Sequence, residues 1–326
     1  MKAKPFQEAT VTAVMRAFKR TSTGRYLVAD EPGLGKTFVA RRVLSELSSR
    51  EKLTVLYVCA NQSIAAQNVD QLLGELPVEE RKSARASADR PGLLPLTSPP
   101  DHPCLNIYSL TPGTAFSGAK RRHKGRVQER AFATALLEYS AGSKLQWLRD
   151  ELSWNSHNFD FLLKDYGEKI IRRVSHIDKG FAQFVARFST AMRECINAEK
   201  LVKTHVALKA IIDTKKSCTR LDVTGWCRNS LAAAALEELD PGLIIFDEFQ
   251  RFRDLMANAE TSLDPAEARI RNILTAETSG RLLLLSATPY EALRPATKAE
   301  RHEMSAVRCK IMGTMTTTSF GCWIFC

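Results

Sequence analysis

Short apolar runs recur along the chain, each short enough to form a buried strand rather than a helix. They are residues 26–29, 53–60, 104–110, 243–246 and 281–290. A strand that is apolar at consecutive positions is covered on both faces, as in a parallel sheet between layers of helices. The pattern therefore predicts an α/β fold with a mostly parallel sheet covered by helices on both faces.

Stretches with helical periodicity lie between these runs. The first, residues 5–18, begins at a proline and places its larger apolar residues on one face. Further helices are expected at 37–47, 64–73 and 230–239. By contrast, residues 77–103 are rich in Pro, Ser, Arg and Ala, and predict a loop with no packing signal.

The α/β alternation stops in the middle of the chain. Helical periodicity over 131–139, 159–174 and 181–207 indicates a helical insertion, because strand-like runs resume after it. The expected organisation is a discontinuous sheet domain, a basic helical insertion, and a tail that we expect to be poorly ordered or aberrant. Their bounds are 1–116 with 229–290, then 117–228, and finally 291–326.

The positive charge is concentrated in this insertion. The chain carries a net charge of +11, and residues 117–230 hold 22 Lys and Arg against 12 Asp and Glu. The densest cluster is Lys120, Arg121, Arg122, Lys124 and Arg126. Such a block favours a polyanionic partner, with nucleic acid as the leading candidate. The alternative is that these side chains only solvate helical faces.

Several classes of protein are disfavoured. No run approaches 18 consecutive apolar residues, and the first ten residues lack the apolar core of a secretory signal. The eight cysteines form no C-x-x-C pair and have no His at zinc spacing, which favours reduced thiols. We expect a cytoplasmic or nucleoid-associated protein with no membrane partner.

A candidate phosphate-binding loop follows the first apolar run. Gly33, Leu34, Gly35, Lys36 and Thr37 lie between a predicted strand and a predicted helix. Glycines let the loop backbone curl around an anion, the lysine pairs with phosphate oxygens, and the threonine hydroxyl suits Mg²⁺. Asp30 stands where the usual pattern has its first glycine. The alternative is that Gly-Lys-Thr only caps a surface helix.

Two carboxylates follow the apolar run 243–246. Asp247 is suited to hold Mg²⁺ through its water shell, and Glu248 to orient and deprotonate a water. The alternative is an acidic helix cap after a strand. The last apolar run ends in the hydroxyls of Ser286 and Thr288.

These pieces, in this order, resemble superfamily 2 helicases and translocases of the Swi/Snf-like or DEAD/DEAH-like branch. In the Swi/Snf-like branch the phosphate loop commonly reads Asp-Glu-x-Gly-Leu-Gly-Lys-Thr, as residues 30–37 do here, so Asp30 supports the resemblance. The resemblance covers the sheet domain and implies the first RecA-like domain of such an enzyme, with ATP and Mg²⁺ as cofactors.

The resemblance also implies residue roles. The residues expected to bind ATP are Gln7, which would read adenine, and Gly33, Leu34, Gly35, Lys36 and Thr37. Metal binding would fall to Thr37 and Asp247, and hydrolysis to Lys36, Asp247 and Glu248. Coupling to nucleic acid would involve Gln250, Ser286 and Thr288. Nucleic-acid contacts would fall at Asn61 and Gln62. From the charge, and not from the resemblance, further nucleic-acid contacts are expected at the basic cluster, Lys120, Arg121, Arg122, Lys124 and Arg126.

Such enzymes bind ATP between two RecA-like domains, and the second supplies arginine fingers. We find motifs of the first domain only, and so expect a truncated ATPase lobe that hydrolyses ATP slowly and does not translocate alone. Arginine fingers contribute ~10³–10⁵ in rate in related enzymes. Its expected partners are nucleic acid, DNA before RNA, and a second RecA-like domain in trans. The alternatives are a basic nucleic-acid- or protein-binding module with a vestigial ATP site, and a non-functional fragment.

Overall fold

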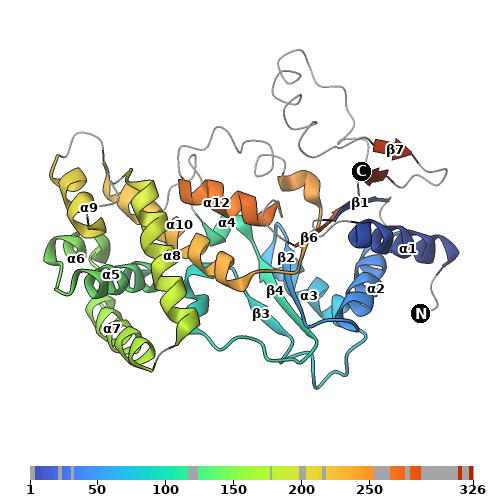
Figure 1. Ribbon diagram of the computed structural model, residues 1–326, viewed down its shortest axis with the longest axis horizontal. Coiled ribbons are helices and arrows are strands. Elements are labelled where there is room, and N and C mark those ends of the chain that lie inside the picture. Colours follow the sequence, from blue (N-terminus) through green and yellow to red (C-terminus); the bar gives the residue numbers. More distant parts are fainter. Residues whose placement is uncertain are drawn as a thin grey trace, which may run out of the picture.

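The computed structural model describes most of the chain (Figure 1). The described residues are 4–20, 24–30, 33–116, 124–176, 178–197, 203–214, 218–252, 265–275 and 280–287, with the backbone of 315–317 and 323–325. Thr288, Lys120, Arg121 and Arg122 lie outside them, as does most of the tail 291–326.

Three groups of elements follow one another along the chain. The first group is α1 (Pro5–Arg20), β1 (Arg25–Ala29), α2 (Lys36–Ser48), β2 (Leu53–Val58), α3 (Gln62–Leu72), β3 (Arg85–Ser87), the 3-10 helix η1 (Pro91–Leu96), β4 (Leu105–Leu110) and α4 (Pro112–Ala115). The second is α5 (Val127–Ala141), α6 (Gln146–Ser153), α7 (Phe159–Ser175), α8 (Lys179–Cys195), α9 (Thr204–Asp213) and α10 (Arg220–Leu239). The third is β5 (Leu243–Phe246), the 3-10 helix η2 (Phe249–Phe252), α12 (Pro265–Leu274), β6 (Arg281–Ser286), β7 (Met315–Thr317) and β8 (Trp323–Phe325).

The sheet has the order β3-β4-β2-β5-β6-β1-β8-β7. The strands from β3 to β1 are all parallel, whereas β8 pairs with β1 and with β7 in the antiparallel sense. The predicted α/β fold with a mostly parallel sheet is therefore confirmed. Strands β8 and β7 extend the sheet from within the tail that the sequence did not resolve into elements.

Consecutive strand residues face two separate hydrophobic clusters. In β1, Tyr26 and Val28 pack in the cluster that α1, α2 and α3 complete. Leu27 and Ala29 pack in the cluster on the other face, with α10 and α12. Figure 1 shows these helices on either side of the strands. Because both faces are covered, the strands are apolar at nearly every position.

The prediction for residues 77–103 was wrong. Part of this stretch forms the edge strand β3, which pairs in parallel with β4, and η1 follows. Ala84 and Ala88 on either side of β3 are fully buried. An edge strand of Arg, Ala and Ser has no apolar run, so the pattern of apolar residues does not predict it.

The helical region has its own core at one end of the molecule (Figure 1). Phe132 of α5 stacks on Phe184 of α8 with ring centroids 5.9 Å apart, and meets Tyr166 of α7 edge-on at 5.7 Å. The predicted helix 181–207 is in fact two helices, α8 and α9. The short helix α6 was not predicted.

Helix α10 belongs to both the helical region and the sheet domain. Val223, Cys227 and Leu231 pack in the core of the helical region. Ala233 and Leu236 pack against the sheet. The boundary expected between residues 228 and 229 therefore falls within a continuous helix, which begins ten residues before the predicted start at 230.

A buried ionic cluster joins α5 and α10 to the short helix α4 and to the start of η1. Arg228 Nε lies 3.3 Å from Glu129 Oε1, and Arg90 Nη1 lies 3.4 Å from Glu129 Oε2. Both arginines also donate to the carbonyl oxygen of Thr114. The Arg228 and Glu129 side chains are 0% and 2% exposed. Burial lowers the pKa of Arg228 below its ordinary value, and the charge of Glu129 opposes that shift.

Among the helices of the described residues, none combines the length and apolarity needed to cross a membrane.

Candidate functional site

Three neighbouring strands, β5, β6 and β1, end at the same edge of the sheet. Ala29 of β1 is paired with Ser286 of β6, and Phe246 of β5 is paired with Leu284. Adjacent strands are about 4.8 Å apart, so the ends of β1 and β5 lie roughly 10 Å from each other. The residues that follow these strands therefore face one another across the end of β6.

The candidate phosphate loop has the backbone that its glycines predict. Gly33 and Gly35 have φ angles of 86° and 89°, in the left-handed region. A Cβ on Gly35 would lie 2.3 Å from Gln7 Nε2, whereas a Cβ on Gly33 would meet nothing within 4 Å. Helix α2 begins at Lys36 directly after Gly35, so the backbone N–H groups of its first turn lie next to the loop.

Lys36 lies over the end of β1. Its Nζ donates to the carbonyl oxygen of Asp30, at 2.9 Å. Burial raises the pKa of the Asp30 carboxyl, and the nearby Lys36 charge opposes this shift. The ammonium is thus held beside the loop, on a flexible side chain that can exchange a carbonyl for a stronger acceptor.

Gln7 contacts the loop itself. Its Nε2 donates to the carbonyl oxygen of Leu34 at 2.9 Å, and its Oε1 accepts from the backbone N–H of Lys4 at 3.0 Å. Helix α1 is therefore attached to the phosphate loop through this amide. The adenine-reading role expected of Gln7 remains a prediction. The Nε2 amide carries two hydrogens, and the bond to Leu34 uses one of them.

The Asp247 carboxylate is held by two side chains that the sequence did not single out. Tyr57 OH donates to its Oδ2 at 2.5 Å, and Asn68 Nδ2 donates to the same oxygen at 2.8 Å. The pKa of Tyr57 is raised well above its ordinary value, mainly by burial and secondly by the charge of Asp247. The phenol therefore keeps its proton and donates it to the hydrogen bond. The backbone N–H of Asp247 also donates to Val58, which anchors the residue to β2.

A chain of hydrogen bonds runs from β6 to the second acid. Ser286 Oγ donates to Gln250 Oε1 at 3.0 Å, and Gln250 Nε2 donates to Glu248 Oε2. Glu248 has a φ of 54°, an uncommon value for a residue with a side chain, and such strain is concentrated at functional sites. The structure thus brings Glu248, Gln250 and Ser286 together, and the coupling role expected of Gln250 and Ser286 stays a prediction.

The residues predicted to touch nucleic acid fall in two places. Asn61 caps α3, where its side chain accepts from the N–H of Ser63, and Gln62 donates to Asp89. Both are exposed. Lys124 and Arg126 are also exposed but precede α5 in the helical region. Among the described residues, no hydrogen bond or ion pair joins these two places.

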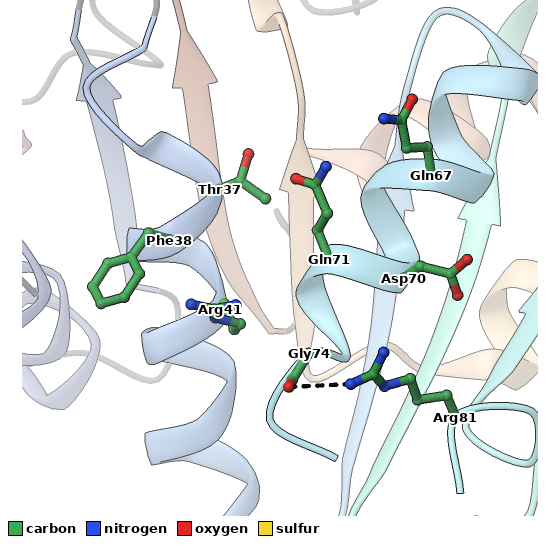
Figure 2. Close-up of a pocket in the computed structure, with 8 residues that line it drawn as sticks. All are labelled: Thr37, Phe38, Arg41, Gln67, Asp70, Gln71, Gly74 and Arg81. Carbon is green, nitrogen blue, oxygen red and sulfur yellow. Dashed lines mark hydrogen bonds between the residues drawn. The ribbon is translucent and has the colours of Figure 1, made fainter. Parts of the chain in front are cut away.

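A groove of about 550 Å³ lies between α2 and α3 (Figure 2). It is lined by Thr37, Phe38, Arg41, Gln67, Asp70, Gln71, Gly74 and Arg81. Figure 2 shows Thr37 at one end of the groove, and Arg81 donating to the Gly74 carbonyl oxygen at the other. The threonine hydroxyl predicted to bind metal is therefore next to open space rather than packed in the core.

The donor set suits a magnesium nucleotide. Mg²⁺ is commonly held by one or two protein oxygens and completed by phosphates and waters. Thr37 and Asp247 offer a hydroxyl and a carboxylate, and a Cβ on Gly33 would meet nothing within 4 Å. In the part of the chain that the structure describes, no group of three or more His, Cys, Asp or Glu side chains is placed to hold a metal ion. A magnesium ion at Thr37 and Asp247 would therefore need phosphate and water oxygens as its other ligands.

Comparisons with known proteins do not assign this arrangement to a family. No family model matches the chain, and no curated protein matches it significantly.

Proposed function

We propose that this chain binds Mg²⁺-ATP at the edge formed by β1, β6 and β5, and that it is the ATP-hydrolysing first lobe of a nucleic-acid-dependent ATPase with a RecA-like fold. The observation that carries the proposal is the hydrogen-bonded chain Ser286–Gln250–Glu248, which lies across the sheet edge from Lys36. An acid at a strained backbone position, at the same end of the sheet as a loop that carries a lysine and two glycines, suits phosphate chemistry.

The proposed roles follow from the contacts. Lys36 exchanges the Asp30 carbonyl for the β- and γ-phosphate oxygens, and the N–H groups of the first turn of α2 bind the same phosphates. Glu248 accepts a proton from the water whose oxygen attacks the γ-phosphorus, as the bond to the β–γ bridging oxygen breaks. When bound, Mg²⁺ neutralises phosphate charge, and Thr37 and Asp247 are the residues that would hold it.

The partners proposed for this activity are nucleic acid, DNA before RNA, and a second RecA-like domain supplied in trans. Gln250 and Ser286 support coupling of this kind, because they connect the acid to the neighbouring strand.

Nucleotide binding and turnover test the proposal separately. We would measure binding of a fluorescent ATP analogue with Mg²⁺, and phosphate release with and without DNA. Lys36→Ala should weaken binding about 10–100-fold, since a hydrogen bond to a charged group contributes roughly 1.5–3 kcal/mol. Glu248→Gln should keep binding and lower turnover about 10²–10⁴-fold.

Lys52→Ala is the matched control. Lys52 is exposed and precedes β2, at the opposite end of the sheet. Equal effects of Lys36→Ala and Lys52→Ala on binding would contradict the proposal.

A binding module with a vestigial ATP site is the second candidate. It is favoured by the excess of basic residues between 117 and 230 and by the exposure of Lys124 and Arg126. In that case Lys124→Glu/Arg126→Glu should weaken DNA binding and flatten its salt dependence, without any effect of ATP.

A further inference from the structure

The carboxylate of Asp247 is fixed by residues that lie far from it in the sequence. Tyr57 belongs to β2 and Asn68 to the second turn of α3, 190 and 179 residues away from Asp247. The two donors also contact each other, with Asn68 Nδ2 at 2.9 Å from Tyr57 OH. The three groups form a closed triangle, so neither donor can turn without disturbing the other.

Both donors take the same oxygen. Tyr57 and Asn68 donate to Oδ2, and no donor from the described residues is found on Oδ1. The carboxylate is therefore oriented with one oxygen held by protein and the other available. Tyr57 is 2% exposed, so its hydrogen bond is protected from competition by water.

We propose that Tyr57 and Asn68 are positioning residues that orient Asp247 toward the magnesium of a bound nucleotide, and that Asn68 connects helix α3 to that site. The inference rests on the proposed function and adds residues outside the predicted motifs. Groups that hydrogen-bond a metal-binding carboxylate fix its direction, and their loss commonly weakens metal binding by ~10–100-fold.

Helix α3 is placed to transmit a change at its start. Gln62, its first residue, donates to Asp89, whose Oδ1 accepts from the N–H of Thr111 at 2.7 Å. Asn68 lies six residues further along, about 9 Å up the helix. On its groove side the same helix carries Gln67 and Gln71 opposite Thr37 (Figure 2). Both proposed metal-binding residues thus adjoin α3, and a shift of this helix would change the contact between Asn68 and Asp247, whose backbone is anchored to β2.

The test is the Mg²⁺ dependence of nucleotide binding in Tyr57→Phe and Asn68→Leu. Tyr57→Phe keeps the ring and Asn68→Leu keeps the branched shape of the side chain, and each change removes the donor. The Mg²⁺ concentration that half-saturates binding of the fluorescent ATP analogue should rise about 10–100-fold. Binding in EDTA, where Lys36 and the loop act without metal, should stay within twofold of wild type. A role in packing alone would alter both measurements or neither.

Tyr108→Phe is the matched control. Tyr108 lies on β4, is also buried, and packs in the cluster on the other face of the sheet. Removing its hydroxyl should not change the Mg²⁺ requirement. Circular dichroism would establish that each variant folds; Tyr57→Phe, which keeps the ring, serves if Asn68→Leu does not.

Two outcomes would overturn the inference. One is a Mg²⁺ requirement within twofold of wild type in both variants while Lys36→Ala still loses ATP, which leaves the proposed function intact. The other is an additional loss when Asn68→Leu is placed in an Asp247→Asn background, since a residue that acts through Asp247 should then add nothing. Failure of the wild-type chain to bind the analogue would instead reject the proposed function, and this inference with it.

Discussion

The buried pair between Glu129 and Arg228 offers a direct test of how the helical region is attached to the sheet domain. We consider Glu129→Gln, which preserves the shape of the side chain and removes its charge. Arg228, 0% exposed, would then be left buried with a hydrogen bond to a neutral amide. Arg90, which lies 3.4 Å from the same carboxylate, would add a like charge nearby.

The expected loss is large. Removing one partner of a buried ion pair costs about 3–5 kcal/mol, because the remaining charge stays buried without its counter-charge. The amide oxygen of glutamine can still accept one hydrogen bond, so we expect a value of about 3 kcal/mol, at the low end of that range. Arg228→Gln combined with Glu129→Gln removes both charges and should be less destabilised than the sum of the two single variants.

Urea denaturation provides the assay, with the free energy of unfolding taken from the midpoint and slope. Glu75→Gln is the control, because Glu75 makes an ion pair of similar length with Arg42, 3.5 Å, on the surface. With the two side chains 35% and 44% exposed, that pair should contribute no more than ~1 kcal/mol. Equal losses in Glu129→Gln and Glu75→Gln would refute the argument from burial.

Three further predictions concern single residues. Gly35→Ala should lower the free energy of unfolding by about 1–2 kcal/mol, because alanine would adopt a left-handed backbone with its Cβ 2.3 Å from Gln7 Nε2; an unchanged urea midpoint would contradict this. Burial raises the pKa of Asp30 above 3.8, so its contribution to stability is complete when it is protonated and is lost as the pH rises through the folded-state pKa. The free energy of unfolding of Asp30→Asn should therefore exceed that of wild type at pH 7, and exceed it by less at pH 4. A difference that grows as the pH falls would contradict a raised pKa. Burial also raises the pKa of the Cys227 thiol to about 12, whereas Cys104 is exposed. Iodoacetamide at pH 8 should label Cys104 readily and Cys227 only in denaturant, as peptide mass spectrometry would reveal.

The central strands could be predicted because burial on both faces requires apolar residues at consecutive positions. Each of β1, β2, β4, β5 and β6 lies between two hydrophobic clusters, and each is an apolar run. Strand β3 lies at the sheet edge, and its sequence Arg-Ala-Ser contains no such run.

A capping box in the sequence marks the start of α10, ten residues before the start that the helical period predicts. Thr219 and Asp222 form a capping box, in which each side chain meets the backbone N–H of the other. The helix is buried nearly all round and rich in alanine, so it lacks the amphipathic period that identified other helices.

Apart from Gln7 in α1, which the family resemblance indicated, the candidate site was predictable where its residues follow strands. Lys36, Asp247 and Ser286 each come soon after or at the end of an apolar run, and parallel strands bring such positions to one edge. Tyr57 and Asn68 belong to no motif, and their contact with Asp247 depends on the packing of α3 against β2. No local pattern can report a contact between residues nearly two hundred positions apart.

Helix α10 contributes side chains to two hydrophobic cores. If either core unfolds and α10 with it, the other core loses the side chains that α10 packs into it. We therefore expect the described helical and sheet regions to melt in a single cooperative transition, although each has an interior of its own. Cleaving the backbone between residues 228 and 229 would break α10 in its buried middle. Cys227 and Leu231, which are buried in the intact helix, would then be exposed to solvent. The helix that looks like a boundary in the sequence is the member that makes the two regions one folding unit.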